Sequence, residues 1–316
     1  MPEFDVVGVG LNATDTLLLV PHFPAYAGKV PYQAEITSPG GQVASAMVAC
    51  ARLGLRAKYI GTVGDDDRGR VQLESLRGTG VNLDHLQLRH GCANQSAYII
   101  IDASTGERTV LWRRDDCLRI DPEQISEEQI TCARLLHIDG HDTPAVAHAA
   151  AIARRHGIPV TVDVDTIYHG FDRVLPNVDY LVASSEFPGA WTGEHDPFAA
   201  LSTLQERYGM KVAAMTLGAH GALALFAGRF YYEPAFVVNC VDTTGAGDVF
   251  HGAFCYAVLQ GMGMRETLEF ANAMAALNCT AMGARGGIHG LEEVRALMSR
   301  AERRSNADFA VRAQHS

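Results

Sequence analysis

The chain has 316 residues, of which 47% are hydrophobic and 20% are charged, so it can bury one large core or two small ones. Its 36 acidic and 26 basic residues give a formal net charge of -10. This excess of negative charge argues against nucleic acid or an anionic membrane as a partner. We therefore expect the partners to be small molecules.

Seven cysteines are scattered singly, with no Cys-x-x-Cys pair. This spacing predicts reduced thiols and not a disulfide framework. The acidic start, with Glu3 and Asp5, lacks the basic region of a signal peptide. No apolar run approaches the ~18 residues that a membrane-spanning helix needs. These features predict a soluble, cytoplasmic protein.

The first motif in the chain is similar to the fingerprint of dinucleotide-binding proteins. Gly8 to Ala13 reads Gly-Val-Gly-Leu-Asn-Ala, which matches Gly-x-Gly-x-x-Ala. That fingerprint must open a helix, whereas the next residues, Thr14 to Pro21, are typical of a strand that ends at a proline. A nicotinamide-dependent enzyme is therefore disfavoured.

An extended region follows and then a glycine-rich helix start. Thr14 to Thr37 contains three prolines, so it cannot be one helix. Gly40 and Gly41 precede an Ala-rich helical pattern from Val43 to Leu53. Two glycines allow a backbone to approach a ligand closely. We expect this helix start to lie at a binding site.

Beyond this helix, short apolar runs alternate with helical patterns, which predicts a parallel sheet flanked by helices. The expected strands are Lys58 to Ile60, Leu135 to Ile138, Val160 to Val164, Tyr180 to Val182 and Val212 to Leu217. The expected helices are Pro144 to His156 and Pro197 to Tyr208.

One further region breaks this alternation. The runs Ser96 to Ile101 and Arg108 to Trp112 are joined by a turn-forming segment, so they predict a β-hairpin. We expect one α/β domain over residues 1–300, with a small β-lid inserted at about 14–37 and 94–112. Residues 301–316 are expected to be a polar, frayed tail.

A cluster of histidines and aspartates follows the strand that ends near Ile138. His137 and Asp139 share one face of a strand, and Gly140 interrupts the run before His141 and Asp142. The cluster is compatible with a metal site. A strand end that faces a substrate pocket, or simple packing, is the favoured interpretation.

The most informative segment runs from Asp242 to Asp248 and reads Asp-Thr-Thr-Gly-Ala-Gly-Asp. It follows an apolar run and opens a helical pattern. Small residues at a helix start leave backbone N–H groups unshielded, and the helix dipole adds about half a positive charge there. Such a terminus suits a phosphoryl group, and Asp248 in the first turn suits a general base. The segment favours a kinase of small molecules; an ordinary Asp-capped glycine loop is the alternative.

These motifs, in this order, resemble the ribokinase-like sugar kinases, also called the PfkB carbohydrate kinases. The resemblance covers Asp5 to about Leu297, and the stretches Asp242 to Ala253 and Ala275 to Ile288 look most like the bacterial sulfofructose kinases. It implies a ribokinase-like three-layer α/β sandwich with a mostly parallel central sheet and a small β-sheet lid.

The resemblance also implies roles for individual residues. It makes Asp248 the base, Gly245, Ala246 and Gly247 the anion hole, and Asp15, Gly40, Gly41, Ser45 and Lys29 the sugar-binding residues. It places ATP beside Thr216, Gly218, Gly221 and Asn272, with Glu186 organising Mg²⁺. It places a monovalent cation, K⁺, at Asp242, Thr244 and the segment from Ala284 to Gly287. A homodimer is also expected, because an open lid exposes an apolar sheet face.

The sequence departs from the family pattern in three places. Ser45 replaces the usual Asn after the double glycine, and Ala183 replaces the Asn of Asn-x-x-Glu. Asp163-Val164-Asp165 replaces the start of Asp-x-Asn-x-Arg. The substrate therefore stays open among a simple sugar, a nucleoside and an anionic sugar. Lys29, Arg113 and Arg114 are either solvated lid charges or an anion pocket, and Trp112 either stacks on a ligand or fills the lid. A non-catalytic sugar or nucleotide sensor is the remaining alternative.

Overall fold

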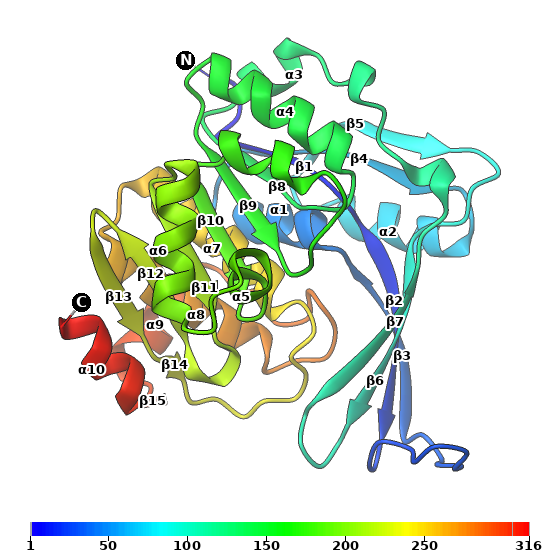
Figure 1. Cartoon of the computed structure of the whole chain (residues 1–316). Coiled ribbons are helices and arrows are strands. Elements are labelled where there is room, and N and C mark those ends of the chain that lie inside the picture. Colours follow the sequence, from blue (N-terminus) through cyan, green and yellow to red (C-terminus); the bar gives the residue numbers. More distant parts are fainter. Residues whose placement is uncertain (1, 305, 316) are drawn as a thin grey trace.

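A nine-stranded sheet forms the centre of the molecule, in the order β13-β12-β11-β10-β9-β8-β1-β4-β5 (Figure 1). The computed structural model describes residues 2–304 and 306–315. The strands are β1 (Val6–Val9), β4 (Ala57–Gly64), β5 (Asn82–Arg89), β8 (Leu136–Ile138), β9 (Val160–Val164), β10 (Tyr180–Ser184), β11 (Val212–Thr216), β12 (Ala222–Phe226) and β13 (Arg229–Glu233). Strands β11 to β5 pair in parallel, whereas β12 and β13 are antiparallel. The carboxyl ends of the parallel strands therefore share one edge of the sheet.

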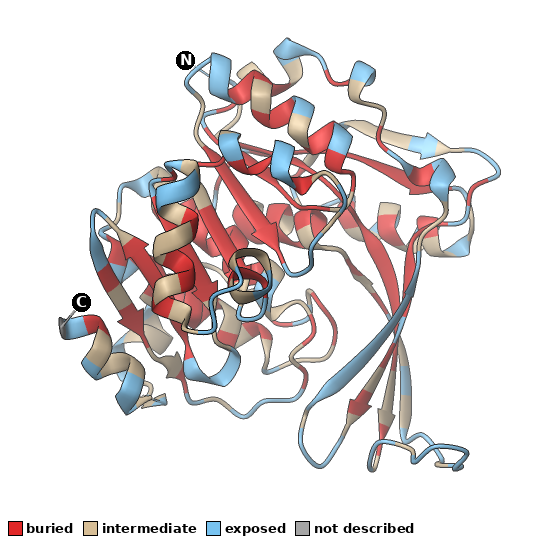
Figure 2. Ribbon diagram, in the orientation of Figure 1, coloured by how far each residue is buried: buried red, intermediate tan, exposed pale blue. Residues whose placement is uncertain are grey.

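Helices cover both faces of this sheet and produce three layers. One core cluster joins the sheet to α3 (Glu127–Thr131), α4 (Thr143–Arg155), α5 (Phe187–Thr192), α6 (Pro197–Tyr208) and α10 (Ala307–His315). The other joins it to α1 (Gln42–Arg52), α2 (Asp67–Leu76), α7 (Ala246–Gln260), α8 (Met264–Asn278) and α9 (Leu291–Arg300). Central strands are buried on both faces, as Figure 2 shows, because helices pack on each side. The expected α/β sandwich is confirmed.

A second sheet of four strands projects from the body (Figure 1). Its order is β3-β2-β6-β7, with β2 (Ala13–Val20), β3 (Ala34–Gly40), β6 (Ser96–Asp102) and β7 (Arg108–Arg113). The predicted hairpin is present as β6 and β7, which pair antiparallel. The inner face of the sheet carries a small cluster of Leu17, Ile99 and Ile101. This lid sheet stands beside the carboxyl edge of the main sheet.

The glycines of the dinucleotide-like pattern have a packing role. A Cβ on Gly8 would lie 2.6 Å from Val43, and one on Gly10 would lie 2.5 Å from the same side chain. The following residues form strand β2 and not a helix. The absence of side chains lets α1 pack closely on β1, and the pattern opens no dinucleotide site.

The C-terminal segment differs from the expected frayed tail. Arg303–Arg304 forms β15, which pairs with β14 (Ala235–Phe236). Helix α10 then packs on β13 (Figure 1), and the ring of Phe309 stacks on those of Phe198 and Tyr232. The polar composition of this segment gave no sign of the contact, because a short helix needs only one apolar face to pack on β13. Among the described residues, no helix is long and apolar enough to cross a membrane.

The expectation that all cysteines are reduced is wrong for one pair. Cys92 and Cys117 form a disulfide, whereas Cys50, Cys132, Cys240, Cys255 and Cys279 are free. Cys92 lies four residues before β6, and Cys117 lies four residues after β7. The bond therefore ties the two ends of the lid hairpin together. The isolated positions of the cysteines in the sequence gave no sign of this disulfide, because only the tertiary fold brings Cys92 and Cys117 together.

Reduction of this disulfide is expected to lower the free energy of unfolding by about 3 kcal/mol, because the bond closes a loop of 25 residues in the unfolded chain. Thermal or denaturant unfolding with and without a thiol reductant measures the effect. The variant Cys92→Ser should show no response to the reductant. Equal stability of the wild type in both conditions would show that the loop closure contributes nothing.

Candidate active site

A cavity of about 220 Å³ lies where the lid sheet meets the carboxyl edge of the main sheet. Strands β2, β6 and β7 supply one wall, and the start of α7 supplies another. The residues that line it are Leu11, Ala13, Asp15, Gly41, Gln42, Gln95, Ala97, Ile99, Arg108, Val110, Trp112, His141, Asp165, Thr166, Tyr168, Thr244, Gly245 and Asp248. Ligands of open α/β sheets bind at this edge. This cavity is the candidate active site.

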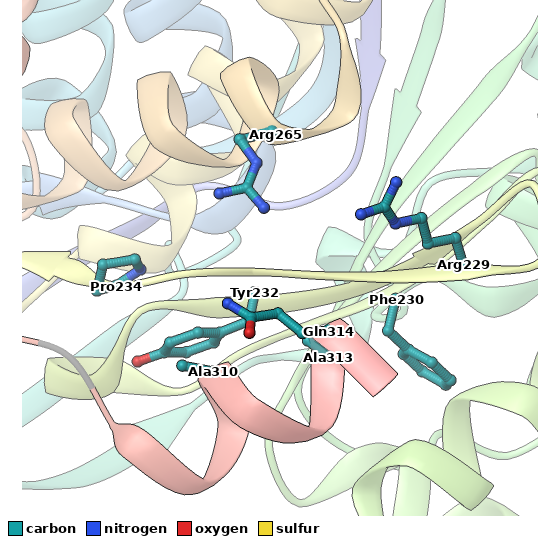
Figure 3. A pocket seen from close by; sticks show the side chains of 8 residues that line it. All are labelled: Arg229, Phe230, Tyr232, Pro234, Arg265, Ala310, Ala313 and Gln314. Carbon is teal, nitrogen blue, oxygen red and sulfur yellow. The ribbon is translucent and has the colours of Figure 1, made fainter. Parts of the chain in front are cut away.

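A second cavity, of about 150 Å³, lies between β13 and α10 at the far edge of the sheet (Figure 3). Arg229 and Arg265 border it. The guanidinium of Arg265 is 2.9 Å from Glu233, and that of Arg229 lies over the ring of Tyr231. None of the carboxylates expected to act in the chemistry lines this cavity, so we do not assign the reaction to it.

The start of α7 lies at the cavity, where the anion hole is expected. Gly245 is the N-cap residue, with φ 72°, and no side chain caps the helix. A side chain there would clash with the backbone oxygen of Ala284, so the position requires glycine. Gly247 faces open space, because a Cβ added to it would meet no atom within 4 Å. The N-terminal end of a 15-residue helix, which begins at Ala246, thus lies at the cavity through Gly245 and Asp248.

Asp248 lies in the first turn of α7 and faces the same cavity. Burial raises the pKa of its carboxyl to about 7, and the negative charges of Asp163 and Asp15 act in the same direction. The charge of Arg108 opposes this shift. A carboxyl with its pKa near neutrality is suited to accept a proton from an alcohol.

With Asp248 in the role of base that the family resemblance implies, this pKa sets the pH dependence that we expect for the reaction. A base acts when it is ionised, so we expect kcat/KM for the acceptor to fall as the pH drops through about 7. Above that pH the rate should level off. Steady-state rates from about pH 5 to about pH 9 test this expectation. A profile that stays flat down to about pH 5 would contradict it.

Asp15 lies across the cavity from α7, on strand β2. Its side chain is buried, and burial raises the pKa of its carboxyl to about 6, although Arg285 opposes the shift. A Cβ on Gly40 would lie 2.5 Å from its Oδ2, so the glycine makes room for the carboxylate. Gly41 lines the cavity with φ 97°. Asp15, Gly40 and Gly41, the residues expected to bind the sugar, are thus brought together on one side of the cavity.

Ser45 and Lys29 are not brought to the cavity wall. Ser45 is buried on α1, and its hydroxyl accepts a hydrogen bond from Nε of Arg285 at 3.1 Å. Arg285 also donates to the carbonyl of Gly40 at 2.8 Å, so Ser45 lies beneath the double glycine. Lys29 is exposed in the loop between β2 and β3. Gln42, which follows Gly41, lines the cavity instead, and its buried Oε1 has no hydrogen-bond partner among the described residues.

The two arginines at the lid base are paired with carboxylates. Arg114 lies 2.5 Å from Asp142 in a buried ion pair, and Arg113 lies 2.9 Å from Asp115. The positive charge that lines the cavity comes from Arg108, which sequence reasoning missed. Its Nη1 donates to Oγ1 of Thr243 at 2.6 Å, across a separation of 135 residues. No local pattern signals such a contact.

The residues expected beside the nucleotide lie at the same sheet edge, next to the cavity. Thr216 ends β11, Gly218 and Gly221 follow it, and Glu186 is the exposed N-cap residue of α5 after β10. Asn272 has a structural partner, because its Nδ2 donates to the backbone oxygen of Glu233 at 2.9 Å. The order of the strands brings the loops after β10 and β11 to one edge of the sheet. Asn272 is buried, and it hydrogen bonds to the backbone of residues 233–234, which precede β14.

The expected cation residues form a network of oxygens behind the helix start. Asp242 is buried and accepts hydrogen bonds from the amides of Thr244, at 2.9 Å, and Gly283, at 2.8 Å. The backbone oxygens of Thr244 and Ala284 converge on Nδ2 of Asn278. The buried Oγ1 of Thr244 has no hydrogen-bond partner within the described part of the chain. These oxygens fit a monovalent cation.

Aromatic side chains form the outer wall of the cavity. The hydroxyl of Tyr168 lies 2.9 Å from Nε2 of His141, and Trp112 meets the ring of His141 edge-on. Trp112 thus faces the cavity and not only the lid interior. Asp139 is buried and accepts from the amide of Leu11 at 2.7 Å, which supports packing for the histidine–aspartate cluster. No group of three or more potential metal ligands is found among residues 2–304 and 306–315.

Comparisons with known proteins show the family of the chain. Residues 6–289 match the model of the pfkB family of carbohydrate kinases. An ATP-dependent ribose-1-phosphate kinase of Halopiger xanaduensis is 29% identical, covering 89% of this chain and 93% of the relative. A ribokinase of Schizosaccharomyces pombe is 30% identical, covering 82% and 86%.

Solved structures share the fold. A protein of Agrobacterium tumefaciens that is considered a ribokinase has a TM-score of 0.86 at 29% identity, covering 94% of this chain and 97% of the other. The ribokinase of Arabidopsis thaliana complexed with ribose and ATP has a TM-score of 0.77 at 22% identity, covering 94% and 99%. The family match spans most of the sequence and includes every loop of the cavity. The chain therefore belongs to the pfkB family of carbohydrate kinases.

Proposed function

We propose that this carbohydrate kinase transfers the γ-phosphate of ATP to a hydroxyl of a small sugar, with Asp248 as the general base. One observation carries the proposal: Asp248, the uncapped start of α7 and Asp15 line a single cavity. Asp15 lies where it can hold sugar hydroxyls, opposite the amides of Gly245, Ala246 and Gly247. A carboxylate base and an anion hole on one helix turn are the two groups that this transfer needs.

The base and the anion hole have different roles in the proposed transfer. Asp248 accepts the proton of the attacking hydroxyl, which contributes about 10²- to 10⁴-fold to the rate. The amides at Gly245 to Gly247 face the transferring oxygens, and one lost donor in such a hole costs about 3 to 4 kcal/mol. Arg108 of the lid adds positive charge beside them. Lid closure excludes water and limits wasteful hydrolysis of ATP.

ATP and Mg²⁺ fit the remaining groups at the sheet edge. Thr216, Gly218 and Gly221 would border the nucleotide, and Glu186, whose side chain is exposed, would hold Mg²⁺. Mg²⁺ supplies charge neutralisation of the phosphates when it is bound. Asn272 would support this site through the backbone of residues 233–234.

Potassium is the proposed monovalent cation at Asp242 and Thr244. The Oγ1 of Thr244 has no hydrogen-bond partner among the described residues, and it supports the proposal together with the backbone oxygens of Thr244 and Ala284. The cation would fix the loop that leads into α7. Rates that stay unchanged when K⁺ is replaced by a large organic cation would refute it.

Two features of the cavity each favour a different acceptor from a simple sugar. Among the described residues, the guanidinium of Arg108 donates hydrogen bonds to the backbone oxygen and the Oγ1 of Thr243, which are neutral acceptors. Its charge therefore suits an anionic sugar such as a phosphosugar or sulfofructose. The related ribose-1-phosphate kinase bears a name of that class. The aromatic wall of Trp112, His141 and Tyr168 suits a nucleoside base instead. A non-catalytic sensor is disfavoured, since it has no need of Asp248.

The test is release of ADP with Mg-ATP across pentoses, hexoses, nucleosides, phosphosugars and a sulfosugar. A strong response that depends on Asp248 supports the kinase and names its acceptor. Stabilisation by a sugar without any release of ADP would support the sensor. Loss of a response to anionic sugars alone in Arg108→Gln would assign the anion to the lid arginine.

A homodimer is proposed through the lid. The edge strand β7 is exposed along its whole length, and Leu111 pairs with Tyr98 on β6, which is 47% exposed. These two side chains lie on the face of the lid opposite Val110 and Trp112, which line the cavity. An apolar sheet of this kind is suited to pack on a second copy. A monomeric mass at micromolar concentration would refute this proposal.

A further inference from the structure

A buried imidazole–carboxylate pair lies directly behind Asp248. Nε2 of His251 lies 3.2 Å from Oδ1 of Asp163, and the two side chains are 4% and 9% exposed. His251 follows Asp248 by three residues on α7, so both side chains lie on the same face of the helix. Neither His251 nor Asp163 has a role in the function proposed above.

Asp163 creates an electrostatic problem for the base. It lies on β9, which is buried along its length and packs against α7. After burial, its negative charge is the largest contribution that raises the pKa of Asp248. Two carboxylates that share a poorly solvated region disfavour the ionisation of each other. An uncompensated Asp163 would therefore keep Asp248 protonated.

Several other charged or titratable groups face the base and the pair. They are Asp15 on β2, Arg108 on β7, His137 on β8, Asp165 after β9, and Arg285. The ring of His137 lies 5.6 Å from that of His251 and is hydrogen bonded to Thr161. Arg108 belongs to the lid hairpin, whereas His251 belongs to the same helix as Asp248. His251 is thus the basic group that lies beside Asp163 and does not belong to the lid.

We propose that His251 is a positioning residue for the kinase reaction: as an imidazolium it neutralises Asp163 and so allows Asp248 to ionise. This rests on the proposed role of Asp248 as the base. The geometry supports it, because a ring nitrogen is aimed at the carboxylate and both groups are shielded from water. A buried carboxylate is stable when it is paired, and removal of its partner leaves an uncompensated charge.

The titration of the Asp248 carboxyl tests the inference directly. It is followed by NMR of the protein with ¹³C-labelled aspartate, and Asp248→Asn assigns the signal. His251→Gln keeps an amide donor near Asp163 but removes the charge, so the titration should move up by about one pH unit. Adding Asp163→Asn to His251→Gln should move it back down. A shift that a second substitution reverses is not expected from damage to the packing.

His148→Gln is the matched control, because His148 is exposed on α4 and its ring is hydrogen bonded to the backbone oxygen of Ile125. Asp248 should titrate in this variant as in the wild type. If His251→Gln does not fold, Asp163→Asn alone should lower the titration point of Asp248. The acid limb of kcat/KM should move in parallel in each active variant.

Two results would overturn the inference. One is an unchanged titration of Asp248 in folded His251→Gln, and the other is an Asp163→Asn substitution that leaves the titration point where it was. The NMR measurement needs no substrate. A failure to phosphorylate any sugar would therefore count against the proposed function alone. The NMR titration would still show whether His251 and Asp163 affect the ionisation of Asp248.

Discussion

Asp248→Asn is expected to fold normally and to lose at least about 10²-fold in turnover. Asparagine has nearly the same shape, but its amide cannot accept the proton of the attacking hydroxyl. Burial and the charges of Asp163 and Asp15 raise the pKa of Asp248, so the neutral side chain removes repulsion and should not destabilise the fold. Turnover and thermal unfolding of the same preparation measure both effects.

The control for this substitution is Asp84→Asn. Asp84 is exposed on β5 and accepts a hydrogen bond from Asn82 at 2.8 Å, away from the cavity. It should retain the turnover of the wild type. Near-normal turnover in Asp248→Asn would remove Asp248 from the mechanism and leave the anion hole and substrate positioning as the only sources of catalysis.

The main sheet was predictable because its strands are short buried runs with distinct boundaries. Val160–Val164 was expected at the bounds that the structure has, and Pro197–Tyr208 likewise as a helix. Strand β5 was missed, because its half-buried residues, such as His85 and Gln87, give no continuous apolar signal. A hydrophobic period of two or 3.6 residues arises when one side of an element is buried. Strands at the edge of the sheet are less buried, so they are the hardest to predict from the sequence.

The site was predictable only where a motif is continuous in sequence. The segment Asp242 to Asp248 carries the proposed base, the proposed anion hole and the proposed cation oxygens within seven residues, so one continuous motif predicts all three. Contacts between distant segments gave no such signal. Arg108 reaches Thr243, Arg285 reaches Ser45, and Cys92 reaches Cys117 only because the chain folds. Single-sequence patterns describe local structure, whereas these contacts depend on tertiary packing.

Gly245→Ala is expected to lower the free energy of unfolding by about 2 to 4 kcal/mol and turnover by at least about 10²-fold. The residue has φ 72°, which an alanine adopts at a cost, and its new Cβ would clash with the backbone oxygen of Ala284. Relief of that clash moves the first amides of α7 away from the phosphoryl group. Denaturant unfolding and steady-state kinetics measure the two losses.

Gly247→Ala is the matched substitution, two residues further along the same helix start. Its Cβ would meet no protein atom within 4 Å, and alanine is favoured over glycine in a helix by about 1 kcal/mol, so stability should hold or rise. Turnover should still fall, because the methyl group enters the space where the transferring phosphoryl group is proposed to lie. Full turnover in Gly247→Ala would show that this space is not used. Equal losses of stability in both variants would show instead that the two glycines serve the fold and not the anion hole.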